Sequence, residues 1–314
     1  MALESSFECY IDSRNDKYLS YLWNKLSYSV IDLTESCEVF SEVKVLMCFP
    51  DYFLDISTVR RLPNLRFILS PTTGVTHLDR KLLSRSDIQI IKLDSSSPDI
   101  QKIRSTVELG IWHCIESVRQ TSSHLVFESS LYARPRFPCD TLQGKNILIV
   151  GFGRIGRQMA SILTALGGVV SGVDPRGREP GSTIPVFENL ECKKLSQLLT
   201  TIELVVIACS YEGYAVFSKD VLNRLPKGCS LVNIARGDLV DEKALVQLLE
   251  QGVLERYCTD VATNSLLKMG DRFLALTKLG KLVVTPHIGG FTEYGLKVAS
   301  KFVGAKYIEK SSSN

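Results

Sequence analysis

The sequence has no long apolar run and no strong excess of charge. Of its 314 residues, 45% are hydrophobic and 23% are charged, and the net charge is +3. These values are typical of a globular chain, and so small a charge does not favour nucleic acid or an anionic membrane. No segment approaches the roughly 20 apolar residues of a membrane helix, and the N-terminus does not resemble a signal peptide. We therefore expect neither nucleic acid nor membrane among its partners.

Paired cysteines and clustered histidines are also lacking. The nine cysteines are scattered, odd in number and without a Cys-x-x-Cys pair, and the four histidines show no metal-ligand spacing. Disulfide frameworks and zinc sites need paired or regularly spaced ligands. The sequence therefore predicts reduced thiols in a cytoplasmic protein, and no bound metal.

One segment carries a strong pattern. The apolar run 145–150 leads into a Gly-x-Gly-x-x-Gly turn, and a helical pattern follows. The first glycine allows a tight turn, the second lets a pyrophosphate approach the backbone, and the third lets the helix pack close to the strand. The helix N-terminus offers free N–H groups to phosphates. The predicted dinucleotide-binding residues of this turn are Gly151, Phe152, Gly153, Arg154, Ile155 and Gly156.

The cofactor is predicted from the acid that follows this turn. Asp174 ends the next apolar run, 18 residues after Gly156. A carboxylate there can accept hydrogen bonds from the ribose hydroxyls and repels a 2′-phosphate, so NAD is favoured over NADP. Arg176 and Arg178 leave two alternatives open, because they could flank a phosphate or be solvated loop charges.

Short apolar runs alternate with helical patterns on both sides of the turn. Strands joined by helix-length connections imply parallel sheets, so the predicted fold class is α/β, with two doubly wound domains. The segment 131–138, with two prolines, is expected to be extended, either as an arm reaching another subunit or as a linker. The expected strands are 7–11, 43–48, 65–69, 88–91, 145–150, 169–173, 204–208, 230–233 and 281–284. The segments 17–26, 56–62 and 78–84 are expected to be helices or turns, and the expected helices are 105–120, 157–166, 195–199, 219–225, 243–251 and 293–308.

Two charged side chains are predicted to lie near the nicotinamide. Arg236 and His287 each come directly after a predicted strand, and ligands bind at the carboxyl ends of parallel strands. An arginine there can clamp a carboxylate, and a histidine can transfer a proton near neutral pH. Alone, each would be a surface or structural residue. Together, after a dinucleotide site, they indicate a catalytic pair.

These motifs resemble those of the D-isomer-specific 2-hydroxyacid dehydrogenase family, from about Leu65 to Gly290. The segment 236–245 is similar to its arginine motif and 285–290 to its histidine motif. The loop 73–79 resembles its carboxylate-binding loop. The segments 142–145 and 107–109 are similar to its lead into the cofactor turn and to its inter-domain helix.

The resemblance implies an NAD-dependent oxidoreductase that transfers a hydride between nicotinamide and a small 2-oxo or 2-hydroxy acid. Arg236 would hold the substrate carboxylate and polarise the carbonyl, and His287 would protonate the developing alkoxide. The backbone N–H groups of Thr73, Gly74 and Val75 would complete the carboxylate site. Ala235, Asp260 and His287 would contact the cofactor.

The resemblance also implies the domain organisation. A flavodoxin-like substrate domain would comprise residues 1–104 plus 291–314, because the C-terminal helix returns to it. Residues 105–290 would form the NAD-binding Rossmann domain. The expected assembly is a homodimer built through the cofactor domains.

At one position the chain departs from the family pattern. Where the family has the glutamate that orients and stabilises the charged catalytic histidine, this chain has Ser265, followed by Leu266 in place of proline. Serine offers no negative charge, so 2-oxo acid reduction should decline at lower pH than in glutamate-bearing relatives. Two alternatives stay open: a non-catalytic NAD(H)-binding regulatory protein, and a reductase of another carbonyl class. Glu255 or Asp271 could substitute for the glutamate in space.

A second departure concerns the substrate. The segment 47–52 is apolar and acidic where phosphoglycerate dehydrogenases carry a basic residue that helps hold the substrate phosphate. This argues against a phosphorylated substrate. Phe49 and Tyr52 would either favour an apolar substrate side chain or belong to the core.

Overall fold

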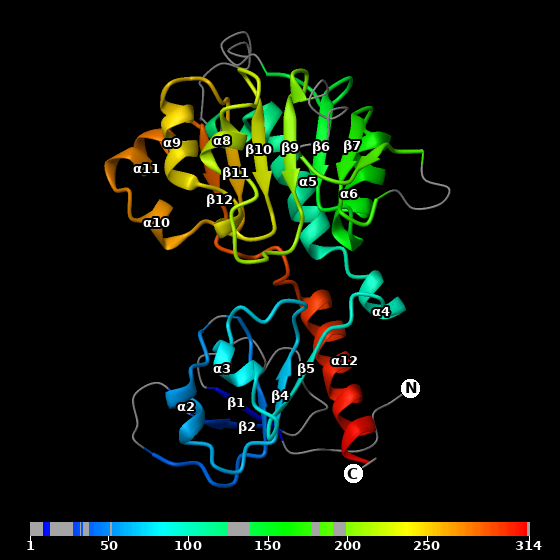
Figure 1. The fold of residues 1–314 in the computed structure, drawn as a ribbon, viewed down its shortest axis with the longest axis vertical. Helices are drawn as coiled ribbons and strands as arrows, with labels where there is room; N and C mark the ends of the chain where they lie inside the picture. The colour runs from blue at the N-terminus through cyan, green and yellow to red at the C-terminus, as the bar shows by residue number, and fades with distance from the viewer. Residues whose placement is uncertain are drawn as a thin grey trace, which may run out of the picture. The chain divides into compact units, whose positions relative to one another are not determined.

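A computed structural model describes residues 9–12, 28–31, 33, 38–50, 52–124, 139–177, 183–190 and 199–312. The chain divides into two compact units, residues 1–103 with 292–314 and residues 104–291. Each unit contains one parallel β-sheet (Figure 1). The expected helix or turn 17–26 and the extended segment 131–138 lie outside the described residues, as does nearly all of the expected helix 195–199.

The sheet of the first unit has the strand order β2-β1-β3-β4-β5, the flavodoxin-like order. Its C-terminal helix α12 packs against β4 and β5, and the Tyr307 ring meets the Phe67 ring edge-on at 4.9 Å. The chain therefore returns to this unit after leaving the second. The strands are β1 (Cys9–Asp12), β2 (Tyr28–Ile31), β3 (Val45–Met47), β4 (Phe67–Ser70) and β5 (Gln89–Lys92), and the helices are α2 (Ile56–Arg60), α3 (Arg80–Leu83), α4 (Pro98–Gln101) and α12 (Glu293–Ser311).

The aromatic residues after β3 belong to the core of this unit. Phe49 is 3% exposed and Tyr52 is 9% exposed. Phe49 packs with Met47 and Ile91, and Tyr52 with Leu54 and Leu78. Of the two alternatives for these aromatics, the structure supports the core, and they give no support for an apolar substrate side chain.

The sheet of the second unit has seven parallel strands in the order β12-β11-β10-β9-β6-β7-β8. The strands are β6 (Asn146–Val150), β7 (Val169–Val173), β8 (Val186–Phe187), β9 (Leu204–Ile207), β10 (Ser230–Asn233), β11 (Tyr257–Thr259) and β12 (Leu282–Val284). With helices around both parallel sheets, the α/β fold class predicted from the sequence is confirmed.

Alternate residues of the central strands enter two separate cores. On β6, Leu148 and Val150 face one cluster, and Ile147 and Ile149 face the other. The first core is covered by α8 and α9 and the second by α5 and α6, which makes the unit doubly wound (Figure 1). Its helices are α5 (Ser105–Arg119), α6 (Arg154–Ala165), α8 (Lys219–Leu222), α9 (Glu242–Glu250), α10 (Asn264–Leu267) and α11 (Asp271–Lys278), with 3-10 turns at Thr121–His124 and Gly237–Leu239.

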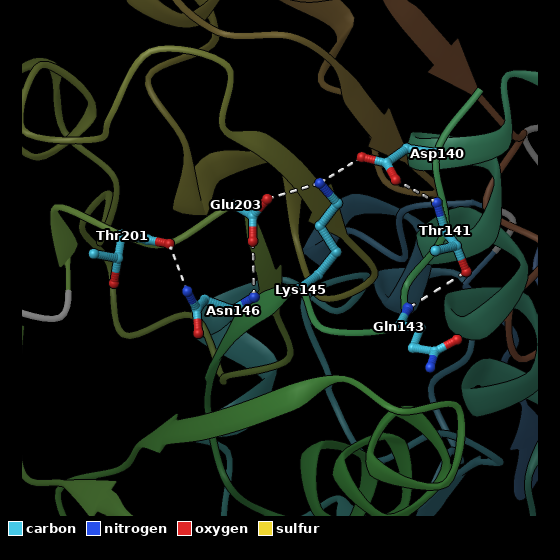
Figure 2. Close-up of polar contacts among 7 residues, drawn as sticks. All are labelled: Asp140, Thr141, Gln143, Lys145, Asn146, Thr201 and Glu203. Atoms are coloured by element: carbon cyan, nitrogen blue, oxygen red, sulfur yellow. Dashed lines mark hydrogen bonds and ion pairs between the residues drawn. The ribbon is translucent and has the colours of Figure 1, made fainter. Parts of the chain in front are cut away.

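Charged side chains hold the start of β6 against the start of β9. Lys145 Nζ lies 2.6 Å from Asp140 and 2.7 Å from Glu203, and the amide of Asn146 donates to Glu203 (Figure 2). Asp140, Lys145 and Glu203 line a hollow of about 570 Å³ at the amino end of the sheet. Since ligands of doubly wound sheets bind at the carboxyl ends, this hollow is not where the cofactor is expected.

No helix among the described residues is long and apolar enough to cross a membrane.

The second unit has two buried clusters of its own, so we predict that residues 104–291 fold alone. The isolated fragment should show a single cooperative thermal transition, because a core of this kind is what defines an independent domain. Circular dichroism at 222 nm during heating tests this. A gradual melt without a transition, while the full chain melts sharply, would contradict it.

Candidate functional site

The loops that carry the predicted site residues lie at one edge of the second sheet. All its strands are parallel, so the turns after β6, β7, β9, β10, β11 and β12 share the carboxyl edge. From β6 the chain runs to β7 on one side and later to β9 on the other. The strand order therefore reverses between β6 and β9, the kind of position at which doubly wound sheets bind ligands.

The three glycines of the turn after β6 differ in what surrounds them. A Cβ on Gly151, whose φ is +95°, would lie 2.4 Å from the amide nitrogen of Cys209, in the turn after β9. A Cβ on Gly156 would lie 2.0 Å from the carbonyl oxygen of Gly151. On Gly153 the nearest atom would be Arg176 Nη2, at 3.4 Å. Packing within the protein thus requires Gly151 and Gly156, while the backbone at Gly153 is open to a ligand.

The remaining residues of the turn are placed by the fold. The ring of Phe152 packs where a Cβ on Gly172 would lie, so only its backbone faces the turn. Arg154 and Ile155 begin α6 and are half-buried. Burial lowers the pKa of Arg154. The 12-residue helix α6 presents its N-terminus at Gly153, an arrangement that fits the pyrophosphate of a dinucleotide.

Asp174, directly after β7, is the acid of this site. Its Oδ2 accepts a hydrogen bond from the amide of Phe152 at 2.9 Å, and its carboxylate pairs with the Arg176 guanidinium at 2.8–2.9 Å. This pairing holds the pKa of Asp174 at about 2. The side chain of Asp174 is 6% exposed and that of Arg176 is 72% exposed. Arg176 is therefore not a purely solvated charge, and Arg178 lies outside the described residues.

The turn after β10 is fixed by Asn233. The Asn233 side chain accepts from the amide of Ala235 at 3.0 Å and donates to the carbonyl of Arg236 at 2.8 Å. Arg236 is half-buried, with Nη1 donating to the carbonyl of Ala235. Burial lowers the pKa of Arg236, but a guanidinium stays charged in proteins. These hydrogen bonds hold the positively charged Arg236 at the carboxyl edge of the sheet. A guanidinium held in this way can bind a carboxylate.

The turn after β12 presents His287 in an uncommon conformation. His287 is exposed and has a φ of +59°, a region that few residues other than glycine enter. Its amide donates to the carbonyl of Thr285 at 3.0 Å. Backbone conformations of this kind persist only where surrounding contacts impose them, and they are frequent at functional sites.

Asp260, after β11, supplies those contacts. Its carboxylate accepts from the amides of Ile288 and Gly289 at 2.9 and 2.7 Å and from the hydroxyl of Thr285 at 2.6 Å. Asp260 therefore binds the histidine turn on both sides of His287. The sequence alone assigned this carboxylate only to the cofactor.

Ser265 lies apart from these contacts. It is exposed in the first turn of α10, and its hydroxyl has no hydrogen-bonding partner among the described residues. Glu255 precedes β11 and lines the hollow at the amino end of the sheet, so it does not replace the missing glutamate.

Glu242, which the sequence reasoning missed, anchors the neighbouring loop. It is 4% exposed and accepts hydrogen bonds from the amide and hydroxyl of Thr263 and from the hydroxyl of Tyr257. Burial raises the pKa of Glu242. An acid in the first turn of an amphipathic helix usually faces solvent, so no sequence signal indicates this role.

In the first unit, the loop after β4 is a candidate anion-binding loop. The hydroxyl of Thr72 donates a hydrogen bond to the carbonyl of Gly74 at 2.6 Å, and the carbonyl of Thr72 accepts one from the amide of Leu93 at 3.0 Å. The amides of Thr73, Gly74 and Val75 have no acceptor among the described residues. Free neighbouring N–H groups of this kind suit a carboxylate.

The fold and the glycine turn define a dinucleotide-binding protein with a doubly wound cofactor unit. The NAD-binding domain of the D-isomer specific 2-hydroxyacid dehydrogenase family matches residues 111–289. The chain belongs to this family, as its motifs predicted, and its cofactor is NAD. By its name the family comprises dehydrogenases with an NAD-binding domain, the class that the motifs predicted.

Individual relatives are more distant. The chain is 30% identical to a D-3-phosphoglycerate dehydrogenase of Haemophilus influenzae over 183 residues, which cover 55% of this chain and 42% of the relative. It is 26% identical to a hydroxypyruvate reductase of Blautia hydrogenotrophica over 238 residues, 73% of this chain and 70% of the relative. The chain thus spans less than half the length of the first relative.

Among solved structures, a D-lactate dehydrogenase of Aquifex aeolicus, complexed with NAD and lactic acid, has a similar fold. The TM-score is 0.73 and the identity 19%, over 96% of each chain. At this identity the likeness confirms the fold.

The glycine turn gives a matched pair of substitutions. We expect Gly156→Ala to lower the free energy of unfolding by about 1–3 kcal/mol, because the added methyl group overlaps the Gly151 carbonyl. Gly153→Ala should keep its stability but bind NADH roughly tenfold more weakly, because its methyl group occupies the side open to the pyrophosphate. Urea unfolding and NADH fluorescence titration measure the two effects. Equal NADH affinity in Gly153→Ala and wild type would contradict this placement.

Proposed function

We propose that the chain is an NAD-dependent D-2-hydroxyacid dehydrogenase that reduces small 2-oxo acids or catalyses the reverse oxidation. The observation that carries this proposal is the order of residues along one sheet edge. Asp174 and the glycine turn follow β7 and β6, while Arg236, Asp260 and His287 follow β10, β11 and β12. A dinucleotide site thus adjoins a cation for a carboxylate and a group that can transfer a proton.

Each residue of this edge has a separate role in the proposed reaction. NAD, when bound, supplies or accepts the hydride at the carbonyl carbon. Arg236 binds the substrate carboxylate and polarises the carbonyl oxygen. His287 donates its proton to the oxygen of the forming hydroxyl group and takes it back in the oxidation. Thr73, Gly74 and Val75 are proposed as a second anion-binding element, because their amides lack protein acceptors among the described residues.

The substrate is proposed to be an unphosphorylated 2-oxo acid. The segment after β3 has no basic residue, and Phe49 and Tyr52 are core residues, so this segment offers no charge to a phosphate. The homodimer stays a prediction from the resemblance, and the cytoplasmic location stays a prediction from the scattered cysteines. Light scattering of the purified protein tests the dimer.

A non-catalytic NAD(H)-binding protein is the second candidate. It is favoured by Ser265, which is exposed and without a hydrogen-bonding partner among the described residues. Arg236 and the constrained turn at His287 argue for the enzyme, because a binding module needs neither.

The first experiment is NADH consumption by the purified full chain with glyoxylate, pyruvate, hydroxypyruvate and phenylpyruvate at pH 6 and pH 8. We expect turnover with at least one acid. His287→Ala should lower kcat by about 100-fold or more, the usual contribution of a general acid. Arg236→Lys should lower kcat/KM by about 100-fold, because an ammonium group cannot make the two parallel hydrogen bonds that a guanidinium makes to a carboxylate.

Arg272→Lys is the matched control, because Arg272 is an exposed residue paired with Glu250 on the surface, and it should leave turnover unchanged. Absence of turnover with every acid, with NADH still bound, would favour the non-catalytic candidate.

The pH dependence tests the effect of Ser265. A negative charge near an imidazolium favours its protonated form, and serine provides none. We therefore expect wild-type reduction to be faster at pH 6 than at pH 8. Ser265→Glu should move the decline to higher pH. Ser265→Gln controls for side-chain size without charge and should keep the wild-type profile. A flat wild-type profile from pH 6 to pH 9, with chemistry limiting, would count against this expectation.

A further inference from the structure

His113 on α5 is a buried histidine to which the proposed reaction gives no role. Its side chain is fully buried, and its Nε2 lies 3.0 Å from the hydroxyl oxygen of Thr285. Thr285 precedes His287 by two residues. This hydrogen bond thus joins the helix α5 to the histidine turn.

The direction of each hydrogen bond follows from what each group can donate. The Asp260 carboxylate only accepts, and it takes the hydroxyl proton of Thr285 at 2.6 Å. A hydroxyl group has one proton, so the Thr285 oxygen must accept from Nε2–H of His113. Burial lowers the pKa of His113 to about 4. His113 is therefore neutral at pH 7, with its proton on Nε2.

This arrangement leaves the other nitrogen unsatisfied. Nδ1 of His113 is buried and has no hydrogen-bonding partner among the described residues. A buried acceptor without a donor costs stability, and an apolar side chain of similar size would avoid that cost. For stability, a histidine is thus less favourable at this position than an apolar residue. The hydrogen bond that its Nε2–H donates is the one contribution that an apolar residue could not make.

The group that receives this hydrogen bond holds the turn of His287. The carbonyl of Thr285 accepts a hydrogen bond from the amide of His287, and the hydroxyl of Thr285 donates one to the Asp260 carboxylate. Asp260 in turn binds the next two amides. A Cβ on Gly289 would lie 2.8 Å from Asp260 Oδ2 and 3.5 Å from Leu109 and Thr106 of α5, so the turn is packed between this carboxylate and the helix.

We propose that His113 is a positioning residue for His287, acting through Thr285 and Asp260. Its Nε2–H fixes the rotamer of the Thr285 hydroxyl, and the oriented hydroxyl completes the hydrogen bonds of Asp260 that hold His287 at positive φ. This inference rests on the proposed function only in taking His287 as the proton donor. The hydrogen-bonded chain itself does not depend on turnover.

The test compares two substitutions of His113 in the full chain. Gln places an N–H donor near the position of Nε2, whereas Leu removes the donor. In His113→Leu, hydrogen exchange of the peptide containing Ile288 and Gly289 should accelerate about five- to tenfold, the effect of losing one buried hydrogen bond. In His113→Gln it should stay within about twofold of wild type. The kcat should follow the same order, while KM for NADH stays unchanged.

Val107→Ala is the matched control, because Val107 is a fully buried residue of the same helix that takes no part in these hydrogen bonds. It should lower global stability without a selective change at residues 288–289. Thr285→Val combined with His113→Leu should add nothing to the effect of Thr285→Val alone. Additive effects of the two substitutions would overturn the proposal.

A wild-type measurement covers the case in which His113→Leu does not fold. Nitrogen-15 NMR should show His113 neutral at pH 7, with a slowly exchanging proton on Nε2. A proton on Nδ1 would overturn the proposal, as would equal exchange at Ile288 and Gly289 in His113→Leu and wild type. If no 2-oxo acid is reduced, the proposed function fails, but hydrogen exchange and the NMR signal still decide the role of His113.

Discussion

The parallel alignment of the seven strands in residues 104–291 is the constraint on which the candidate site depends. Since every strand ends at the same edge, turns far apart in the sequence become neighbours in the order of the strands. Adjacent strands lie about 4.8 Å apart, so β10, which leads to Arg236, and β12, which leads to His287, are about 10 Å apart. The residue between them in this order, Asp260, is the one that binds the histidine turn.

The sequence predicted those parts of the fold that follow from local patterns. The strand 230–233 and the start of α5 at Ser105 agree with the structure, because buried strands and amphipathic helices have their own periodicity. The strands β2, β8 and β11 were not predicted. β11 has only three residues, Tyr257–Thr259, too few to show a period, and it becomes a strand only by pairing with β10 and β12.

The candidate site was predicted only as far as its motifs extend. Glycines and polar residues at fixed spacing predict a cofactor turn and two candidate reactive side chains. By contrast, the positioning contacts join residues such as His113 and Thr285, which are 172 residues apart. A histidine within a helix, or a glutamate such as Glu242 in a first helical turn, has no local pattern that distinguishes burial from exposure. Only the tertiary packing makes them partners of the site.

Asp174 and Arg176 show how such contacts bear on cofactor binding. The Asp174 carboxylate already accepts the amide of Phe152 and the Arg176 guanidinium, so ribose hydroxyls must share it or displace Arg176. The Arg176 side chain is 72% exposed, so its guanidinium regains water when it leaves, and the ribose hydroxyls would replace its hydrogen bonds to the carboxylate. The amide of Phe152 keeps the carboxylate oriented in either case. The pair thus holds the acid in place without closing it to the ribose.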